Sequence, residues 1–208
     1  MSHELLIDEP RDGAANAPTF VFAHGAGGAM DTPFMTTVAR GLAARGVRVV
    51  RFEFPYMAAR RSGGKRGAPD REPLLRRTWS EVVAQVGDAS RLAIGGKSMG
   101  GRIATLVADE LGVGRLICFG YPFHPPGQPQ KLRTEHLRDL RTPALILQGE
   151  RDPFGTRDDV AGYELSRRIR IEWLPDGDHS LKPRAKSGTT ERENLDRAIE
   201  LAAEFATF

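Results

Sequence analysis

The chain has 208 residues, of which 40% are hydrophobic, and its 30 Lys and Arg residues against 27 Asp and Glu residues give a formal net charge of +3. A domain of this size buries roughly 70% of its extended surface, so it needs neither disulfides nor a structural metal. The 23 Gly and 14 Pro residues fall short of the fraction found in low-complexity chains. Composition therefore excludes a disordered or collagen-like protein and predicts a single globular domain over residues 1–208.

Cysteine content and hydropathy indicate the compartment. Cys118 is the only cysteine, so it has no internal disulfide partner, and no Cys and His residues recur at zinc-site spacing. No segment approaches the ~18 uninterrupted apolar residues of a membrane span, and Met1 to Pro10 is acidic where a secretion signal begins with basic and then apolar residues. We therefore expect a soluble, cytoplasmic protein with no membrane partner, no metal and no organic cofactor.

Basic residues cluster between Arg60 and Arg77, where seven Lys and Arg residues oppose two acidic ones. No aromatic residues interleave with these charges and no nucleic-acid-binding motif is present, so nucleic acid is not an expected partner. We interpret this basic segment as a solvated loop and helix face. The alternative is that it steers an anionic substrate toward a nearby site.

Six short runs, mostly apolar and rich in β-branched or aromatic residues, predict strands. In chain order they are Thr19–Ala23, Val47–Phe54, Leu92–Gly95, Leu116–Phe119, Ala144–Leu147 and Ile169–Leu174. Most are continuous apolar runs, which is the pattern of strands covered on both faces.

Six segments with apolar residues three and four positions apart predict helices. In chain order they are Pro33–Arg45, Glu72–Val86, Met99–Leu111, Thr134–Leu140, Asp158–Arg168 and Glu191–Phe205. Because strands and helices alternate, we expect right-handed crossovers and an α/β fold, with a doubly wound, mostly parallel sheet and helices on both faces.

The strongest motif is Gly96-Lys97-Ser98-Met99-Gly100, which lies between a predicted strand and a predicted helix. This is the context that a G-x-S-x-G nucleophile elbow requires, since the serine must sit in a tight turn within reach of a base. A phosphate-binding P-loop is a competing interpretation, but it needs a glycine where Arg91 stands. A third interpretation is that Ser98 only caps the helix, which leaves the flanking glycines unexplained.

A second glycine-rich motif, from His24 to Gly28, directly follows the first predicted strand. A dinucleotide-binding fingerprint would need a glycine where Met30 stands. The motif is better suited to presenting backbone N–H groups to a developing negative charge, with Ala26 and Met99 as the two donors of an oxyanion hole. We expect His24 to tie this loop down, with a direct catalytic role as the alternative.

With these two motifs the sequence resembles the α/β-hydrolase superfamily over nearly its whole length. In that family an acid and then a histidine follow the nucleophile, and the matching residues are Asp152, after the strand Pro143–Gly149, and His179, in the segment 175–181. The resemblance implies that His179 accepts the proton of Ser98 and that Asp152 orients the imidazole. Three neighbouring acidic residues compete with Asp152 for this role: Glu150, Asp176 and Asp178.

Within the superfamily the sequence is similar to small capless hydrolases, including dienelactone-hydrolase-like proteins and the branch that contains a subunit of the non-specific lethal chromatin complex. It differs from dienelactone hydrolases in carrying Ser98 where they usually have cysteine. Only about two dozen residues separate the strands that often flank a cap, and the proline-rich segment from Pro122 to Arg133 occupies half of them. The resemblance therefore implies no cap domain and an open site, which Gly25 and His124 are also candidates to line.

The resemblance implies a serine hydrolase that cleaves a small ester, thioester or related acyl compound through an acyl-enzyme. Because the basic segment lies near the expected site, that acyl substrate is a candidate to be anionic. The alternative is a non-catalytic interaction module that kept the fold, since fold alone does not fix function.

Overall fold

A computed structural model of the chain describes residues 2–11, 13, 16–64 and 67–207. Seven strands form one sheet in the order β1-β3-β2-β4-β5-β6-β7, and every neighbouring pair is parallel except β1 with β3. The strands are β1 Leu5–Asp8, β2 Thr19–Ala23, β3 Arg48–Phe52, β4 Leu92–Lys97, β5 Arg115–Phe119, β6 Ala144–Gly149 and β7 Ile169–Leu174. The predicted doubly wound, mostly parallel sheet is confirmed.

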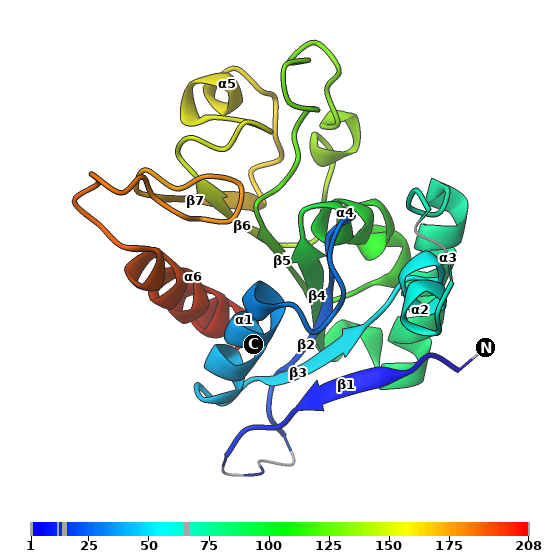
Figure 1. Cartoon of the computed structure of the whole chain (residues 1–208). Coiled ribbons are helices and arrows are strands. Elements are labelled where there is room, and N and C mark those ends of the chain that lie inside the picture. The colour runs from blue at the N-terminus through cyan, green and yellow to red at the C-terminus, as the bar shows by residue number, and fades with distance from the viewer. Residues whose placement is uncertain (1, 12, 14–15, 65–66, 208) are drawn as a thin grey trace.

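Helices cover both faces of the sheet (Figure 1). They are α1 Pro33–Ala43, α2 Pro55–Arg61, α3 Glu72–Val86, α4 Met99–Leu111, α5 Arg157–Ala161 and α6 Glu191–Ala206, with 3-10 turns η1 Ala89–Arg91 and η2 Glu135–Leu137. On one face α1 packs against α6, and on the other α3 packs against α4 (Figure 1). Among the described residues no helix is both long and apolar enough to cross a membrane.

The strands separate two hydrophobic cores because successive side chains point to opposite faces. In β2, Phe20 and Phe22 are fully buried in the core beneath α1 and α6, whereas Val21 and Ala23 are fully buried in the core beneath α3 and α4. A strand buried on both faces reads as a continuous apolar run, and this explains why β2 could be recognised from its sequence.

Two predicted helices are wrong. The segment Thr134–Leu140 forms only the short turn η2. Ser166 holds this segment in a non-helical path: the Ser166 backbone N–H donates to the Leu137 carbonyl, and the Ser166 hydroxyl donates to the Leu140 carbonyl. The segment Asp158–Arg168 forms only α5, which ends at Ala161 with Gly162 as its C-terminal cap.

Two elements were not predicted, β1 and α2. The strand β1 has four residues and lies at the edge of the sheet, where the apolar run is short. The predicted strand Val47–Phe54 ends early, at Phe52, because Pro55 opens α2 at its first position and Phe54 caps it.

The carboxyl edge of the sheet carries no cap. Between β5 and β6 the only element is η2, so the proline-rich excursion adds no helical layer over this edge. The predicted absence of a cap domain is confirmed, and the loops that follow β2, β4, β6 and β7 all end at this edge, where ligands bind in open α/β sheets.

Candidate active site

Ser98 occupies a strained turn between β4 and α4, with φ 51° and ψ −114°. This conformation is rare for a residue with a side chain and is the mark of a nucleophile elbow. The turn is possible because two flanking residues lack side chains: a Cβ on Gly96 would lie 2.5 Å from the Ala23 carbonyl oxygen, and a Cβ on Gly100 would lie 2.6 Å from that of His24. The glycines of the motif are thus required by close backbone approach, which helix capping by Ser98 does not explain.

Substituting Gly100→Ala should therefore destabilise the fold. The new methyl group meets backbone oxygens that cannot move independently, and we expect the free energy of unfolding to fall by about 1–3 kcal/mol. Denaturant titration measures this loss. Gly188→Ala is the matched control, because a Cβ there meets nothing within 4 Å, and equal loss in both variants would contradict the close-approach argument.

A chain of hydrogen bonds connects three of the predicted site residues. The Ser98 Oγ lies 2.8 Å from His179 Nε2, and His179 Nδ1 lies 2.7 Å from Asp152 Oδ2. Because a carboxylate only accepts, the neutral imidazole carries its proton on Nδ1 and leaves Nε2 to accept from the Ser98 hydroxyl. The order serine, histidine, acid along this chain is the arrangement that activates a hydroxyl nucleophile.

Asp152 is fully buried, and its second oxygen is also held. Gln148 Nε2 donates to Asp152 Oδ2 at 2.9 Å, and the Phe154 backbone N–H donates to Asp152 Oδ1 at 2.9 Å. These bonds to the ionised form offset part of the cost of burying a carboxylate and fix its orientation toward His179.

The three competing acids have other partners. Glu150 accepts from Arg157 Nη2 and from the Asp176 backbone N–H. Asp176 pairs with Arg151 and Arg184, which lowers the pKa of Asp176 to about 2, chiefly through hydrogen bonds from Arg184. Asp178 accepts from the backbone N–H groups of the turn that carries His179. The structure therefore brings Asp152, and none of its rivals, to the imidazole.

His179 is held from two further directions. The Phe154 ring stacks on the imidazole at a centroid distance of 4.1 Å, and Lys97 donates from Nζ to the His179 carbonyl. Burial is the main cause that lowers the pKa of His179, and the Lys97 ammonium lowers it further, whereas Asp152 acts in the opposite direction. Burial likewise lowers the pKa of Lys97 to about 8. The net effect favours the neutral imidazole, which is the form that accepts a proton.

The loop after β2 is oriented by His24 and Tyr56. His24 is fully buried, and its Nδ1 donates to the Gly25 carbonyl at 2.7 Å while its Nε2 accepts from the Phe54 backbone N–H. The Tyr56 hydroxyl donates to the Ala26 carbonyl at 2.9 Å. In a trans peptide the N–H points opposite to the carbonyl, so the Ala26 N–H points away from the His24 ring. His24 thus supports the loop, as the first of the two sequence interpretations has it.

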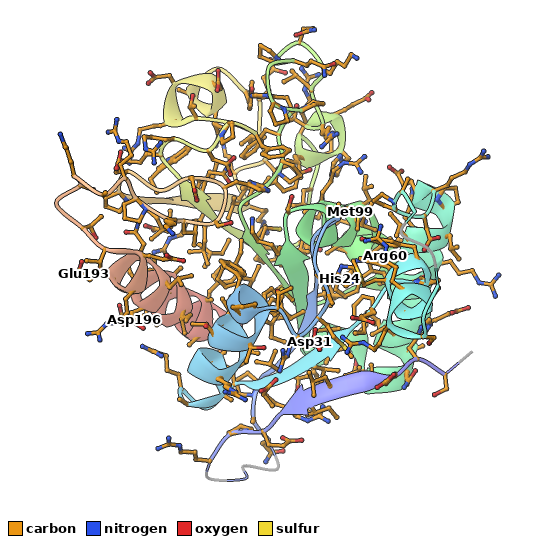
Figure 2. All side chains as sticks on the ribbon, in the orientation of Figure 1. His24, Asp31, Arg60, Met99, Glu193 and Asp196 are labelled. Atoms are coloured by element: carbon orange, nitrogen blue, oxygen red, sulfur yellow. The ribbon has the colours of Figure 1, made fainter. Side chains whose placement is uncertain are left out.

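Figure 2 shows Met99 at the start of α4 and His24 below it, and the His24 carbonyl lies close to Gly100, the residue after Met99. The Met99 N–H is at the first position of a helix, where no carbonyl of the preceding turn faces it. Ala26 and Met99 both border the cavity beside Ser98. The two residues that the sequence predicts as oxyanion-hole donors therefore border the same cavity as Ser98.

Two cavities meet at Ser98. The first, of about 340 Å³, is bordered by His179, Lys97, Gly25 and apolar residues of the α1 segment. The second, of about 390 Å³, extends over α3 and α4 and is bordered by apolar and charged residues. Ala26, Ser98 and Phe154 border both cavities, so the hydroxyl stands at the junction of one open groove.

Two candidate lining residues, His24 and His124, do not border either cavity. His124 is 4% exposed, its Nδ1 donates to the Pro125 carbonyl, and its Nε2 lies 3.7 Å from Asp159, where it packs the proline-rich segment onto α5. The candidate Gly25 does border the first cavity. The sequence places His124 in a loop near the carboxyl edge of the sheet, but only the folded structure shows whether its side chain borders the groove.

The described cations of the basic segment, Arg60, Arg61, Arg71, Arg76 and Arg77, border neither of these cavities. Arg61 forms ion pairs with Glu53 and Asp31. Arg77 forms an ion pair with Glu81. Arg60 lies over the Tyr56 ring and donates to the Gly67 carbonyl. Figure 2 shows Arg60 over the α2 region. Lys65 and Arg66 lie outside the described residues. Within the described ranges, no three His, Cys, Asp or Glu side chains gather in a group able to hold a metal ion.

Sequence reasoning missed three residues that organise the site, Lys97, Gln148 and Phe154. Lys97 occupies the variable position before the nucleophile, and Gln148 lies within the apolar strand β6. A polar residue inside an otherwise apolar strand is the signal that could have identified Gln148, because such a side chain needs a buried partner. No comparable signal marked Phe154.

The sequence and the fold match known proteins. Residues 16–207 match the model of an α/β-hydrolase domain family. Among solved structures, a lidless α/β serine hydrolase of Xanthomonas campestris has 22% identity and a TM-score of 0.71, with 96% of this chain and 87% of that chain covered. An α/β serine hydrolase homologue from Coxiella burnetii has 21% identity and a TM-score of 0.71, with 96% and 89% covered.

A dienelactone hydrolase from Anabaena variabilis is also similar in structure, with 20% identity, a TM-score of 0.69 and coverage of 97% of this chain and 89% of that one. These structural likenesses establish the fold, and the family model spans nearly the whole sequence. The chain therefore belongs to the α/β-hydrolase domain family.

Proposed function

We propose that the protein is a serine hydrolase that cleaves small esters, thioesters or related acyl compounds through an acyl-enzyme on Ser98. The observation that carries this proposal is the hydrogen-bonded chain from the Ser98 hydroxyl through His179 to buried Asp152, with the hydroxyl facing an open groove. Membership of the α/β-hydrolase family supports the same chemistry.

In the first half of the reaction, His179 Nε2 takes the proton of Ser98 as the Ser98 Oγ attacks the acyl carbon. The carbonyl oxygen becomes negative and accepts from the Ala26 and Met99 N–H groups, each worth roughly 2.7–4 kcal/mol in the transition state. Asp152 stabilises the imidazolium. His179 then gives the proton to the leaving group as its bond to the acyl carbon breaks, and Ser98 keeps the acyl group as an ester.

In the second half, a water molecule gives a proton to His179 Nε2 and attacks the acyl-enzyme, and the same proton returns to Ser98 Oγ as the acid departs. Because His179 protonates the leaving group, that group belongs in the cavity that His179 borders. The acyl chain then extends into the second cavity, which Ser98 and Met99 border without His179.

A fluorophosphonate probe tests the proposal directly. Wild-type protein should be labelled, and peptide mapping should place the label on Ser98, while Ser98→Ala should give no labelling. Absence of labelling on a folded wild-type protein, or labelling that persists in Ser98→Ala, would contradict the proposal. The first of these outcomes, together with a stable partner in a pull-down, would favour the non-catalytic interaction module instead.

The pH dependence of kcat/KM gives a further prediction. Only neutral His179 accepts the proton, and burial lowers its pKa below the ordinary 6.5, so activity should rise with pH through a midpoint below 6.5 and then stay level. Removing the nearby ammonium in Lys97→Met should move this midpoint to higher pH. Initial rates on a neutral ester from pH 4 upward measure the midpoints of the wild type and of Lys97→Met. A Lys97→Met midpoint equal to or below the wild-type value would contradict the argument that the Lys97 ammonium lowers the pKa of His179.

A further inference from the structure

The second cavity contains a cation whose charge no neighbour neutralises. Arg133 borders this cavity and is half-buried, and its backbone is fixed because its N–H donates to the Phe123 carbonyl and its carbonyl accepts from the Tyr121 hydroxyl. Within the described part of the chain, the Arg133 guanidinium forms no hydrogen bond or ion pair. A guanidinium presents five donors, so this side chain is available to a ligand.

A second arginine borders the same cavity. Arg102 on α4 donates from Nη2 to Glu72 at 2.9 Å, but its Nε is buried without a hydrogen-bond partner. The two guanidinium groups repel each other: burial and then the charge of Arg102 lower the pKa of Arg133. Two cations held together in partly desolvated surroundings store an unfavourable energy that a bound anion would relieve.

The acidic residues around the cavity do not supply that anion. Glu72 is already paired with Arg102, and Asp70 accepts from the Tyr56 backbone N–H at the start of α2. The electrostatic effect on neighbouring His136 supports a positive surplus, since burial first and Arg102 second lower the pKa of His136 to about 4 against the opposing effect of Glu72. The charge that remains without a partner is that of Arg133.

Apolar side chains form part of the lining of the cavity that Ser98 and Arg133 both border. They include Leu75, Ile103 and Pro122. A substrate that reacts at Ser98 and also reaches Arg133 would suit this lining if it had an apolar chain next to the reacting carbonyl and an anionic group that meets Arg133. A carboxylate matches the planar donor fork of arginine in a bidentate pair.

We infer that the second cavity is an acyl pocket for chains that end in a carboxylate, and that Arg133, assisted by Arg102, binds that carboxylate. This inference rests on the proposed hydrolysis at Ser98 and names its substrate class: monoesters or monothioesters of dicarboxylic acids. From the sequence, the basic segment is a candidate for the region that attracts an anionic substrate, but its described arginines lie outside the groove. The inference assigns that role to Arg102 and Arg133, which border the second cavity.

Kinetics with matched esters test the inference. Mono-4-nitrophenyl adipate has a carboxylate where 4-nitrophenyl hexanoate has a methyl group. The measured quantity is the kcat/KM for the adipate ester divided by the kcat/KM for the hexanoate ester. Arg133→Gln should lower this ratio about tenfold or more, because charge-assisted hydrogen bonds are lost, and Arg133→Lys should recover part of it. The control Arg77→Gln, on the exposed surface of α3, should leave the ratio unchanged.

A binding measurement keeps the inference independent of turnover. Monomethyl adipate should bind to the Ser98→Ala variant in calorimetry, dimethyl adipate should bind more weakly, and adding Arg133→Gln should remove the difference. An unchanged ester ratio in Arg133→Gln, or equal binding of the two adipates, would overturn the acyl-pocket assignment. Hydrolysis of the hexanoate ester with labelling at Ser98 would still support the proposed function, so the two failures are distinguishable.

Discussion

His179→Ala should lower kcat for a neutral ester by about 10⁶-fold, close to the loss expected for Ser98→Ala. In triads that act as a unit, removing the base costs about as much as removing the whole set, because the serine hydroxyl then has no proton acceptor. Here the acceptor is fixed by a 2.8 Å bond to Ser98 Oγ and by the stacked Phe154 ring.

Single-turnover and steady-state rates with 4-nitrophenyl acetate measure this loss, and unchanged thermal unfolding shows that the variant is folded. The double variant Ser98→Ala/His179→Ala is the internal comparison. If its activity were far below that of either single variant, the two side chains would act independently, which would contradict their placement in one proton-transfer chain.

Asp152→Asn should lower kcat by about 10⁴-fold while leaving the fold intact. The amide can donate to His179 Nδ1, which stabilises the tautomer with its proton on Nε2, and that tautomer cannot accept from Ser98. The substitution is nearly isosteric in a fully buried site, so the Gln148 and Phe154 contacts can be kept in part.

Glu150→Gln is the matched control for this prediction. It makes the same chemical change on the same loop, but Glu150 contacts Arg157 and the Asp176 backbone and not the imidazole. Its activity should stay within a few-fold of wild type. Comparable losses in the two variants, measured under the same assay conditions, would contradict the assignment of Asp152 as the orienting acid.

The sequence alone predicted those parts of the fold whose local pattern and tertiary environment agree. Strands buried on both faces, such as β2 and β4, appear as continuous apolar runs, and α3 and α4 begin and end where their periodic patterns do. The elbow around Ser98 was recognisable for a related reason: its glycines are demanded by close backbone contacts that no other residue type allows.

The segments whose structure depends on distant partners were predicted less well. The segment 134–140 has a helical pattern, yet Ser166 from a later part of the chain fixes it as a 3-10 turn through two hydrogen bonds. The helix α2 begins at Pro55, the residue directly after the predicted strand Val47–Phe54, and its seven residues are too few to show a helical period in the sequence.

The site divides in the same way. The sequence by itself determined which residue types could do chemistry and in what order, because the motif around Ser98 and the resemblance to α/β hydrolases pointed to Asp152 and His179. Only the tertiary structure decided which of four acids meets the imidazole and that Lys97 and Phe154 hold it. It also decided that Arg102 and Arg133 border the second cavity. The physical reason is that motifs report local backbone requirements, whereas pairing, burial and charge at a site depend on loops from distant strands that meet only at the edge of the folded sheet.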